Sequence, residues 1–113
     1  MDGIYAMAFR GAADWGTGML ILKDGNIIGA DVSGVQYDGT YKISGESVAV
    51  NFVMTVPPGT SLVQGVPARS ETYKIPVETT IPRAAFENNA PVPLRLPPGP
   101  VNVIFRRLRN LDQ

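Results

Sequence analysis

The chain has 113 residues, and ten Lys and Arg residues balance ten Asp and Glu residues, so its formal net charge is zero. A single domain spanning 1–113 is expected at this length. The sequence contains no cysteine and no histidine, which excludes disulfides, thiolate nucleophiles and the ordinary histidine-based zinc, iron and triad sites. Nucleic-acid-binding proteins usually carry a clear basic excess, so direct nucleic-acid binding is not expected.

The amino-terminal residues do not have the pattern of a signal peptide. Residues 1–9 carry Asp2 and no basic residue, whereas a signal peptide begins with a basic segment. No apolar run approaches the ~20 residues that a membrane span requires. We therefore expect a cytoplasmic protein that does not interact with membranes.

Short apolar stretches separated by turn residues fill the first half of the chain. Turns are indicated at Asp24-Gly25, Ser33-Gly34 and Ser44-Gly45. The first signal is the strongest, because both central residues of a type I′ turn need a positive φ. The spacing predicts strands over 3–10, 15–23, 26–32, 35–43 and 48–56.

Two of these predicted strands, 3–10 and 48–56, are apolar on both faces. If one face points into a core, the other needs a cover. Because symmetric dimers are the commonest soluble oligomers, a second copy of the chain is the simplest cover. We therefore expect a homodimer that uses the region of these two strands.

The second half of the chain is richer in proline. Residues 57–69 hold three prolines and two glycines, and so long a loop in a small domain is either functional or mobile. A strand is expected over 71–80, with Pro76 at a sheet edge or a bulge. The only candidate helical turn covers 83–89. A short strand fits within 91–100, and the last strand is expected over 101–108.

Eight short strands in sequential order predict an all-β fold. The favoured architecture is an eight-stranded up-and-down antiparallel β-barrel. An immunoglobulin-like sandwich is the alternative, but the tight consecutive hairpins favour a meander. No internal repeat of fixed period is visible.

Three motifs have both a chemical and a structural interpretation. Gly16-Thr17-Gly18 could suggest a phosphate loop, but a strand follows it, whereas a phosphate loop needs a helix. Asp31 is either a catalytic carboxylate inside a barrel or, as we favour, a turn cap that accepts from the amides of Ser33 and Gly34. The basic residues of 106–109 form a phosphate or partner contact or, more simply, a solvated tail. No catalytic residue, metal site or cofactor is predicted.

Aromatic residues are spread over several of the predicted strands. Lining a barrel lumen, they would accept an apolar ligand. Packed together, they would fill a small barrel completely, and the sequence leaves both possibilities open. The candidate cavity residues are Tyr5, Phe9, Tyr37 and Phe52.

A recurrent set of residues in 2–39 resembles the GrlR family, which is named for a negative regulator of type III secretion genes in attaching enteric bacteria. A weaker similarity covers 60–80, around Glu71-Thr72-Tyr73-Lys74-Ile75-Pro76. The residues that carry the resemblance are Asp2-Gly3-Ile4-Tyr5, Phe9, Gly16, Gly18, Asp24-Gly25-Asn26, Gly29, Asp31, Tyr37 and Gly39.

The resemblance implies a lipocalin-like or calycin-like barrel with an apolar cavity, present as a homodimer. It also implies a regulator that restrains a helix-turn-helix transcriptional activator, through an acidic run in the hairpin between strands four and five. Here that hairpin is Ser44-Gly45-Glu46-Ser47, and only Glu46 carries a carboxylate. One exposed acid supplies less electrostatic steering than four.

The sequence therefore leads to a non-catalytic binding protein of the bacterial cytoplasm. The first hypothesis is a GrlR-like negative regulator that binds a protein partner such as a transcriptional regulator, through Ser44, Gly45, Glu46 and Ser47 and the loop 57–66. The alternative is a lipocalin-like carrier or sensor of a small apolar ligand. An enzyme is the least favoured class, because the usual catalytic residue pairs are missing.

Overall fold

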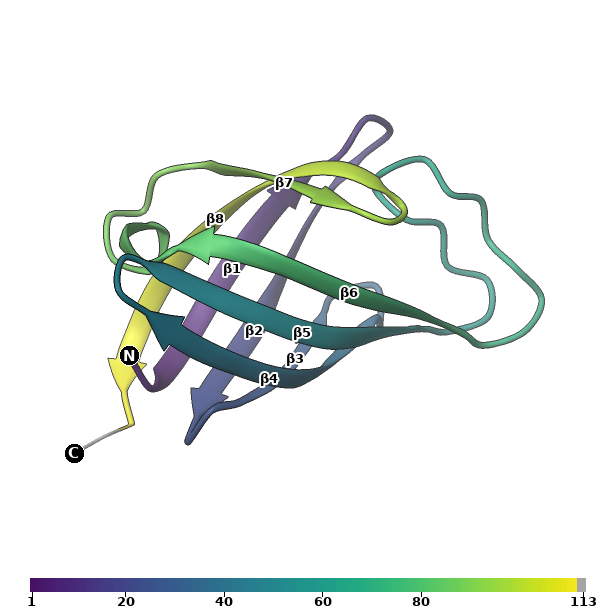
Figure 1. Ribbon diagram of the computed structural model, residues 1–113. Coiled ribbons are helices and arrows are strands. Elements are labelled where there is room, and N and C mark those ends of the chain that lie inside the picture. The colour runs from purple at the N-terminus through teal and green to yellow at the C-terminus, as the bar shows by residue number, and fades with distance from the viewer. Residues whose placement is uncertain (112–113) are drawn as a thin grey trace.

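The protein folds into one eight-stranded antiparallel sheet, seen in a computed structural model that describes residues 1–111. The strand order is β6-β5-β4-β3-β2-β1-β8-β7, and the sheet curls into a nearly closed barrel (Figure 1). The all-β barrel is confirmed, and a two-sheet sandwich is excluded. The elements are β1 (Gly3–Arg10), β2 (Trp15–Lys23), β3 (Asn26–Asp31), β4 (Gln36–Ser44), β5 (Ser47–Val56), β6 (Tyr73–Pro82), the 3₁₀ turn η1 (Arg83–Phe86), β7 (Val92–Leu96) and β8 (Gly99–Asn110).

Short connections join β1 to β5 in sequence, and three of them lie at the predicted turns. At the β2–β3 hairpin both Asp24 (φ 51°) and Gly25 (φ 80°) have positive φ, which is the requirement of a type I′ turn. The observed bounds of β1 and β2 equal the predicted ones. After β6, η1 leads to β7, which contacts β6 without a ladder of hydrogen bonds, and the β7–β8 hairpin brings β8 against β1. The strands therefore follow one another around the barrel in chain order, as the up-and-down prediction requires.

The proline-rich half departs more from expectation. The strand predicted over 71–80 lies two residues later, as β6, and the last strand extends from Gly99 to Asn110. Pro76 of β6 pairs with Val53 of β5, and β6 is a terminal strand of the sheet. The predicted edge position of this proline is therefore confirmed, because an edge strand leaves one side of its backbone without a ladder.

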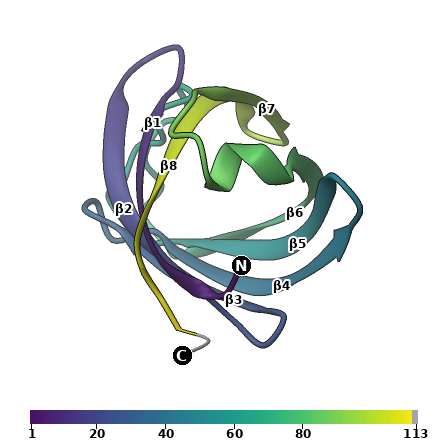
Figure 2. The same ribbon diagram turned by 90° about the vertical axis from the view of Figure 1, so that its left-hand side faces the viewer.

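The two ends of the barrel are covered differently. At one end η1 lies across the opening (Figure 2), and its Phe86 side chain is 2% exposed. The ring of Phe86 lies 5.7 Å from that of Tyr5 and 4.6 Å from that of Phe105. At the other end the long connection between β5 and β6 folds over the opening (Figure 1). Within residues 1–111 no helix is long and apolar enough to cross a membrane.

Candidate ligand cavity

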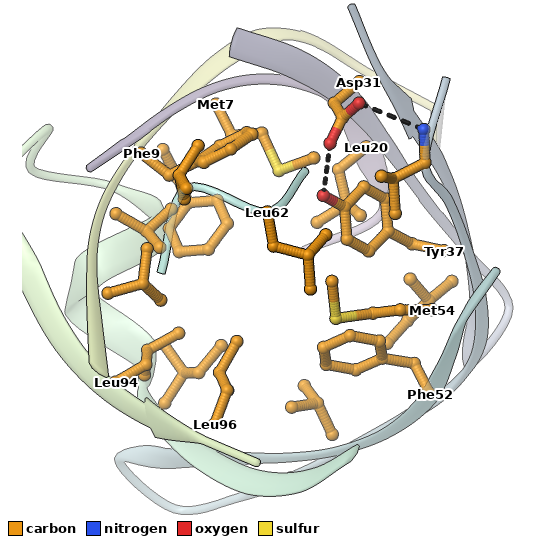
Figure 3. A pocket seen from close by; sticks show the side chains of 18 of the residues that line it. Met7, Phe9, Leu20, Asp31, Tyr37, Phe52, Met54, Leu62, Leu94 and Leu96 are labelled. Carbon is orange, nitrogen blue, oxygen red and sulfur yellow. Dashed lines mark hydrogen bonds between the residues drawn. The ribbon is translucent and has the colours of Figure 1, made fainter. Parts of the chain in front are cut away.

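A cavity that is partly open to solvent lies inside the barrel between η1 and the β5–β6 connection (Figure 3). The space open to the centre of a water molecule is about 100 Å³, whereas one buried water needs roughly 10–15 Å³ by the same measure. Most of the lining is apolar, so water inside would find few hydrogen-bond partners. The apolar lining includes Met7, Phe9, Leu20, Leu22, Ile27, Val35, Val48, Val50, Phe52, Met54, Leu62, Leu94, Leu96, Val101, Val103 and Phe105.

The period-2 geometry of strands explains this lining. Successive side chains in a strand point to opposite faces, so every second residue enters the lumen. In β5, for example, Val48, Val50 and Met54 are buried and Ala49 and Asn51 are exposed. The aromatic rings line the wall without filling the space between them (Figure 3).

The polar residues of the lining are Asp31, Ser33, Tyr37, Tyr41, Ser61 and Gln64. Two of them, Asp31 and Tyr37, are joined by a hydrogen bond inside the barrel. Asp31 ends β3, and its Oδ1 accepts hydrogen bonds from the Ser33 amide (3.0 Å), the Ser33 hydroxyl (2.8 Å) and the Val35 amide (3.1 Å). Its Oδ2 accepts from the Tyr37 hydroxyl at 2.7 Å. The turn-cap interpretation of Asp31 is therefore confirmed, except that the second amide belongs to Val35. The amide of Gly34 donates to the Asp31 main-chain oxygen instead.

The Tyr37 hydroxyl remains a donor over the whole physiological pH range. Burial, and then the negative charge of Asp31, raise the pKa of Tyr37 well above its usual value. The hydroxyl therefore keeps its proton and donates it in the hydrogen bond to Asp31 Oδ2. Within the described part of the chain, Asp31 is the only acidic residue of the lining, and no lysine or arginine lines the cavity.

The β5–β6 connection, residues 57–72, forms a lid over the cavity. Leu62 is 6% exposed and projects into the centre of the lumen (Figure 3). The carbonyl of Val63 accepts from the amides of Ala13 (2.8 Å) and Asp14 (3.2 Å), so the lid is held by the β1–β2 loop. A Cβ at Gly11 would lie 2.4 Å from that carbonyl oxygen, which explains why glycine occupies this position.

Three of the four predicted cavity residues line the cavity, and one does not. Phe9, Tyr37 and Phe52 line the cavity, but Tyr5 does not. Tyr5 is fully buried beneath η1, and its hydroxyl donates to the Met1 carbonyl (2.6 Å). Alternation placed Tyr5 correctly on the inner face of β1. The alternation of β1 could not show that Phe86 fills this end of the lumen.

The predicted partner-binding residues are exposed, but they do not form one surface. Ser44, Glu46 and Ser47 are exposed in the β4–β5 hairpin, where Gly45 adopts a φ of 60°. The Glu46 carbonyl accepts from the Arg83 amide, so this hairpin lies beside η1. The loop 57–66 lies at the other end of β5 (Figure 1). Ten residues at roughly 3.3 Å each place the two about 30 Å apart.

Several lining residues were not singled out from the sequence. Leu62 lies in a proline-rich loop with no periodicity, and Leu94 and Leu96 lie in the short strand β7. The useful signal for Leu62 was the isolated Leu-Val pair within an otherwise small and polar loop. Known protein-family models give no match to the sequence, and no curated protein is significantly similar to it.

Proposed function

We propose that this protein binds a small apolar molecule inside the barrel, without catalysing its conversion. The observation that carries the proposal is the largely apolar, partly open cavity beneath the lid. Small-molecule sites are typically concave, largely apolar and furnished with a few polar groups. The cavity meets this description, with Asp31 and Tyr37 as the polar pair.

The free energy of binding would come from the transfer of apolar surface out of water. Each methylene group transferred contributes roughly 0.8 kcal/mol, which corresponds to about fourfold in affinity. Affinity for a series of straight-chain molecules should therefore rise about fourfold per carbon until the cavity is full. A plateau would then report the length of the cavity.

A titration with the fluorescent probe N-phenyl-1-naphthylamine tests this function. We expect saturable binding at one probe per chain, competed by straight-chain alcohols with the length dependence given above. Leu20→Trp should abolish binding, because Leu20 lines the cavity. Ile28→Trp is the matched control, because Ile28 lies on the next strand but is 54% exposed. Absence of saturable binding to the wild-type protein, or equal loss in both folded variants, would refute the proposal.

A second candidate is a protein-binding regulator, and the outer face of β8, β1, β2 and β3 favours it. Large apolar side chains there are exposed: Met19 by 49%, Ile28 by 54% and Ile104 by 38%. Cross-strand pairing joins them into one patch, because Ala6 and Ala30 flank Met19, Ile21 pairs with Ile28, and Ala8 pairs with Ile104. Contiguous exposed apolar surface is typical of an interface.

We propose that a second copy of the chain covers this patch. Arg106 borders it on β8 and Asp38 borders it on β4, so its two sides carry opposite charge. In a twofold pair, residue i meets residue j and j meets i, which allows Arg106 of each copy to approach Asp38 of the other. The outer face of β5 was expected to contribute, but Asn51 there bonds to Glu78 (3.2 Å) and Ala49 is exposed between polar neighbours.

Sedimentation at micromolar concentration tests the dimer. Arg106→Glu should dissociate it, and Arg106→Glu combined with Asp38→Lys should restore it. A monomeric wild-type protein, or a dimer that is insensitive to both changes, would refute this surface. The GrlR-like role, in which a cytoplasmic barrel restrains a transcriptional regulator through the Ser44–Ser47 hairpin, would further require a stoichiometric partner that is lost on Glu46→Lys.

A further inference from the structure

The polar pair in the cavity presents acceptors but no spare donor. The only proton of the pair, on the Tyr37 hydroxyl, is donated to Asp31 Oδ2 at 2.7 Å. A carboxylate oxygen has about two acceptor sites, and a phenol oxygen can also accept. Within residues 1–111, Asp31 Oδ2 accepts only the Tyr37 bond, and the Tyr37 oxygen accepts none. Unused acceptor sites therefore remain on both oxygens.

The negative charge of Asp31 is the second feature that limits which head groups the cavity can accept. Asp31 is a carboxylate at the edge of an apolar space, and no lysine or arginine among the described lining residues compensates it. Its other oxygen is occupied by the β3–β4 turn, through the Ser33 and Val35 amides and the Ser33 hydroxyl. The turn fixes the carboxylate in place, so it cannot swing away from a bound molecule. Two like charges in a site of low dielectric repel strongly.

We infer that the ligand of this cavity is an apolar molecule whose polar end is a hydrogen-bond donor, a hydroxyl or an amine, and that free carboxylic acids are rejected. This inference rests on the proposed ligand-binding function and specifies its ligand class. A donor head group would bond to Asp31 Oδ2 or to the Tyr37 oxygen while its chain occupies the apolar lumen. An ionised fatty acid would bring its carboxylate close to Asp31 with no cation to receive it, because the other polar lining residues, Ser33, Tyr37, Tyr41, Ser61 and Gln64, are neutral.

Matched ten-carbon competitors test the inference. 1-Decanol, decylamine and decanoate differ only in the head group, and each is titrated against bound N-phenyl-1-naphthylamine at pH 7.5, below the concentration at which it aggregates. We expect decanol and decylamine to displace the probe at concentrations at least tenfold lower than decanoate. Decylamine exceeding decanol would identify the charge of Asp31 as the stronger attraction, whereas equal displacement would identify hydrogen bonding; both outcomes support a donor head group.

Two Asp→Asn variants test whether Asp31 is the source of the preference for decanol over decanoate. Asp31→Asn removes the negative charge and keeps an Oδ1 acceptor for the turn, so the preference for decanol over decanoate should shrink about tenfold. Asp24→Asn makes the same change in the exposed β2–β3 turn, outside the cavity lining, and it should leave the preference unchanged. Tyr37→Phe, which keeps the ring in the wall, should weaken decanol several-fold and the probe hardly at all.

The outcomes separate this inference from the function on which it rests. If the probe binds but decanoate competes as well as decanol in the wild-type protein, the inference is overturned and the ligand-binding function stands. If Asp31→Asn and Asp24→Asn change the preference equally, Asp31 is not its source and the inference is again overturned. If neither the probe nor any competitor binds, both fail. The wild-type comparison decides even if Asp31→Asn folds poorly.

Discussion

Leu62→Ala should open the lid without unfolding the barrel. Leu62 is 6% exposed and is the one residue of the loop 57–72 whose side chain is buried in the lumen. The substitution removes three buried carbons, which at roughly 0.8 kcal/mol each amounts to about 2.4 kcal/mol. If this loss acts on the closed state of the lid alone, the ratio of closed to open lid falls on the order of 50-fold.

Amide hydrogen exchange measures this ratio directly. The amides of Ala13 and Asp14 in the β1–β2 loop donate to the Val63 carbonyl of the lid, so each is protected by this bond only while the lid is closed. In Leu62→Ala their protection should fall about 50-fold, whereas protected amides of the β1–β2 ladder should change little, because local opening precedes global unfolding. Leu108→Ala is the matched control, since Leu108 is 50% exposed on β8.

Two results would refute this reasoning. An equal loss of protection in the lid and in the β1–β2 ladder would mean that Leu62 stabilises the whole barrel and that no separate lid exists. Unchanged protection at Ala13 would mean that hydrogen bonds, and not the buried side chain, hold the lid closed. In either case, access to the cavity would have to be explained by another opening.

Three further changes test other contacts. Tyr73→Phe should raise the free energy of unfolding in urea by about 0.5–1 kcal/mol, because the Tyr73 hydroxyl is buried without a hydrogen-bond partner among the described residues; a loss of stability would contradict this. The hydrogen bond from the Tyr41 hydroxyl holds the pKa of Asp2 below its usual 3.8, so the bond stabilises the fold above that pH, and this stabilisation is lost as the pH falls through the folded pKa. Asp2→Asn should therefore lower the stability at pH 7 and flatten its dependence on acid pH. An unchanged acid dependence would argue against the bond. Gly11→Ala should speed exchange of the lid amides, because its Cβ would meet the Val63 carbonyl; unaltered exchange would show that the lid does not need this glycine.

The pH dependence should have an alkaline limb as well. Burial and the bond to Asp2 raise the pKa of Tyr41 from its usual value of 10.0 to about 12. A group whose pKa is raised by folding stabilises fully below its unfolded pKa, and this contribution is lost as the pH rises towards the folded value. Stability should therefore decline between about pH 10 and pH 12 in urea titrations, and Tyr41→Phe should remove part of that decline.

Local residue patterns determine most of the barrel wall. Alternation and turn chemistry act over two to ten residues, so they predicted β1, β2 and the Asp24-Gly25 hairpin without any knowledge of the rest of the chain. The edge position of Pro76 followed in the same way, from its missing amide hydrogen. The cap of Asp31 on its turn was also local, because an aspartate bonds to amides within a few residues.

Tertiary structure alone decided the candidate site. Whether inward side chains fill a lumen depends on its diameter and on what covers its ends, and those are set by contacts between residues far apart in the chain. Tyr5 and Phe9 occupy equivalent positions in the alternation of β1, yet η1 buries the first and leaves the second on the cavity wall. Likewise, Leu62 becomes part of the lumen only because the lid folds across the barrel, and no periodicity within residues 57–72 encodes that closure.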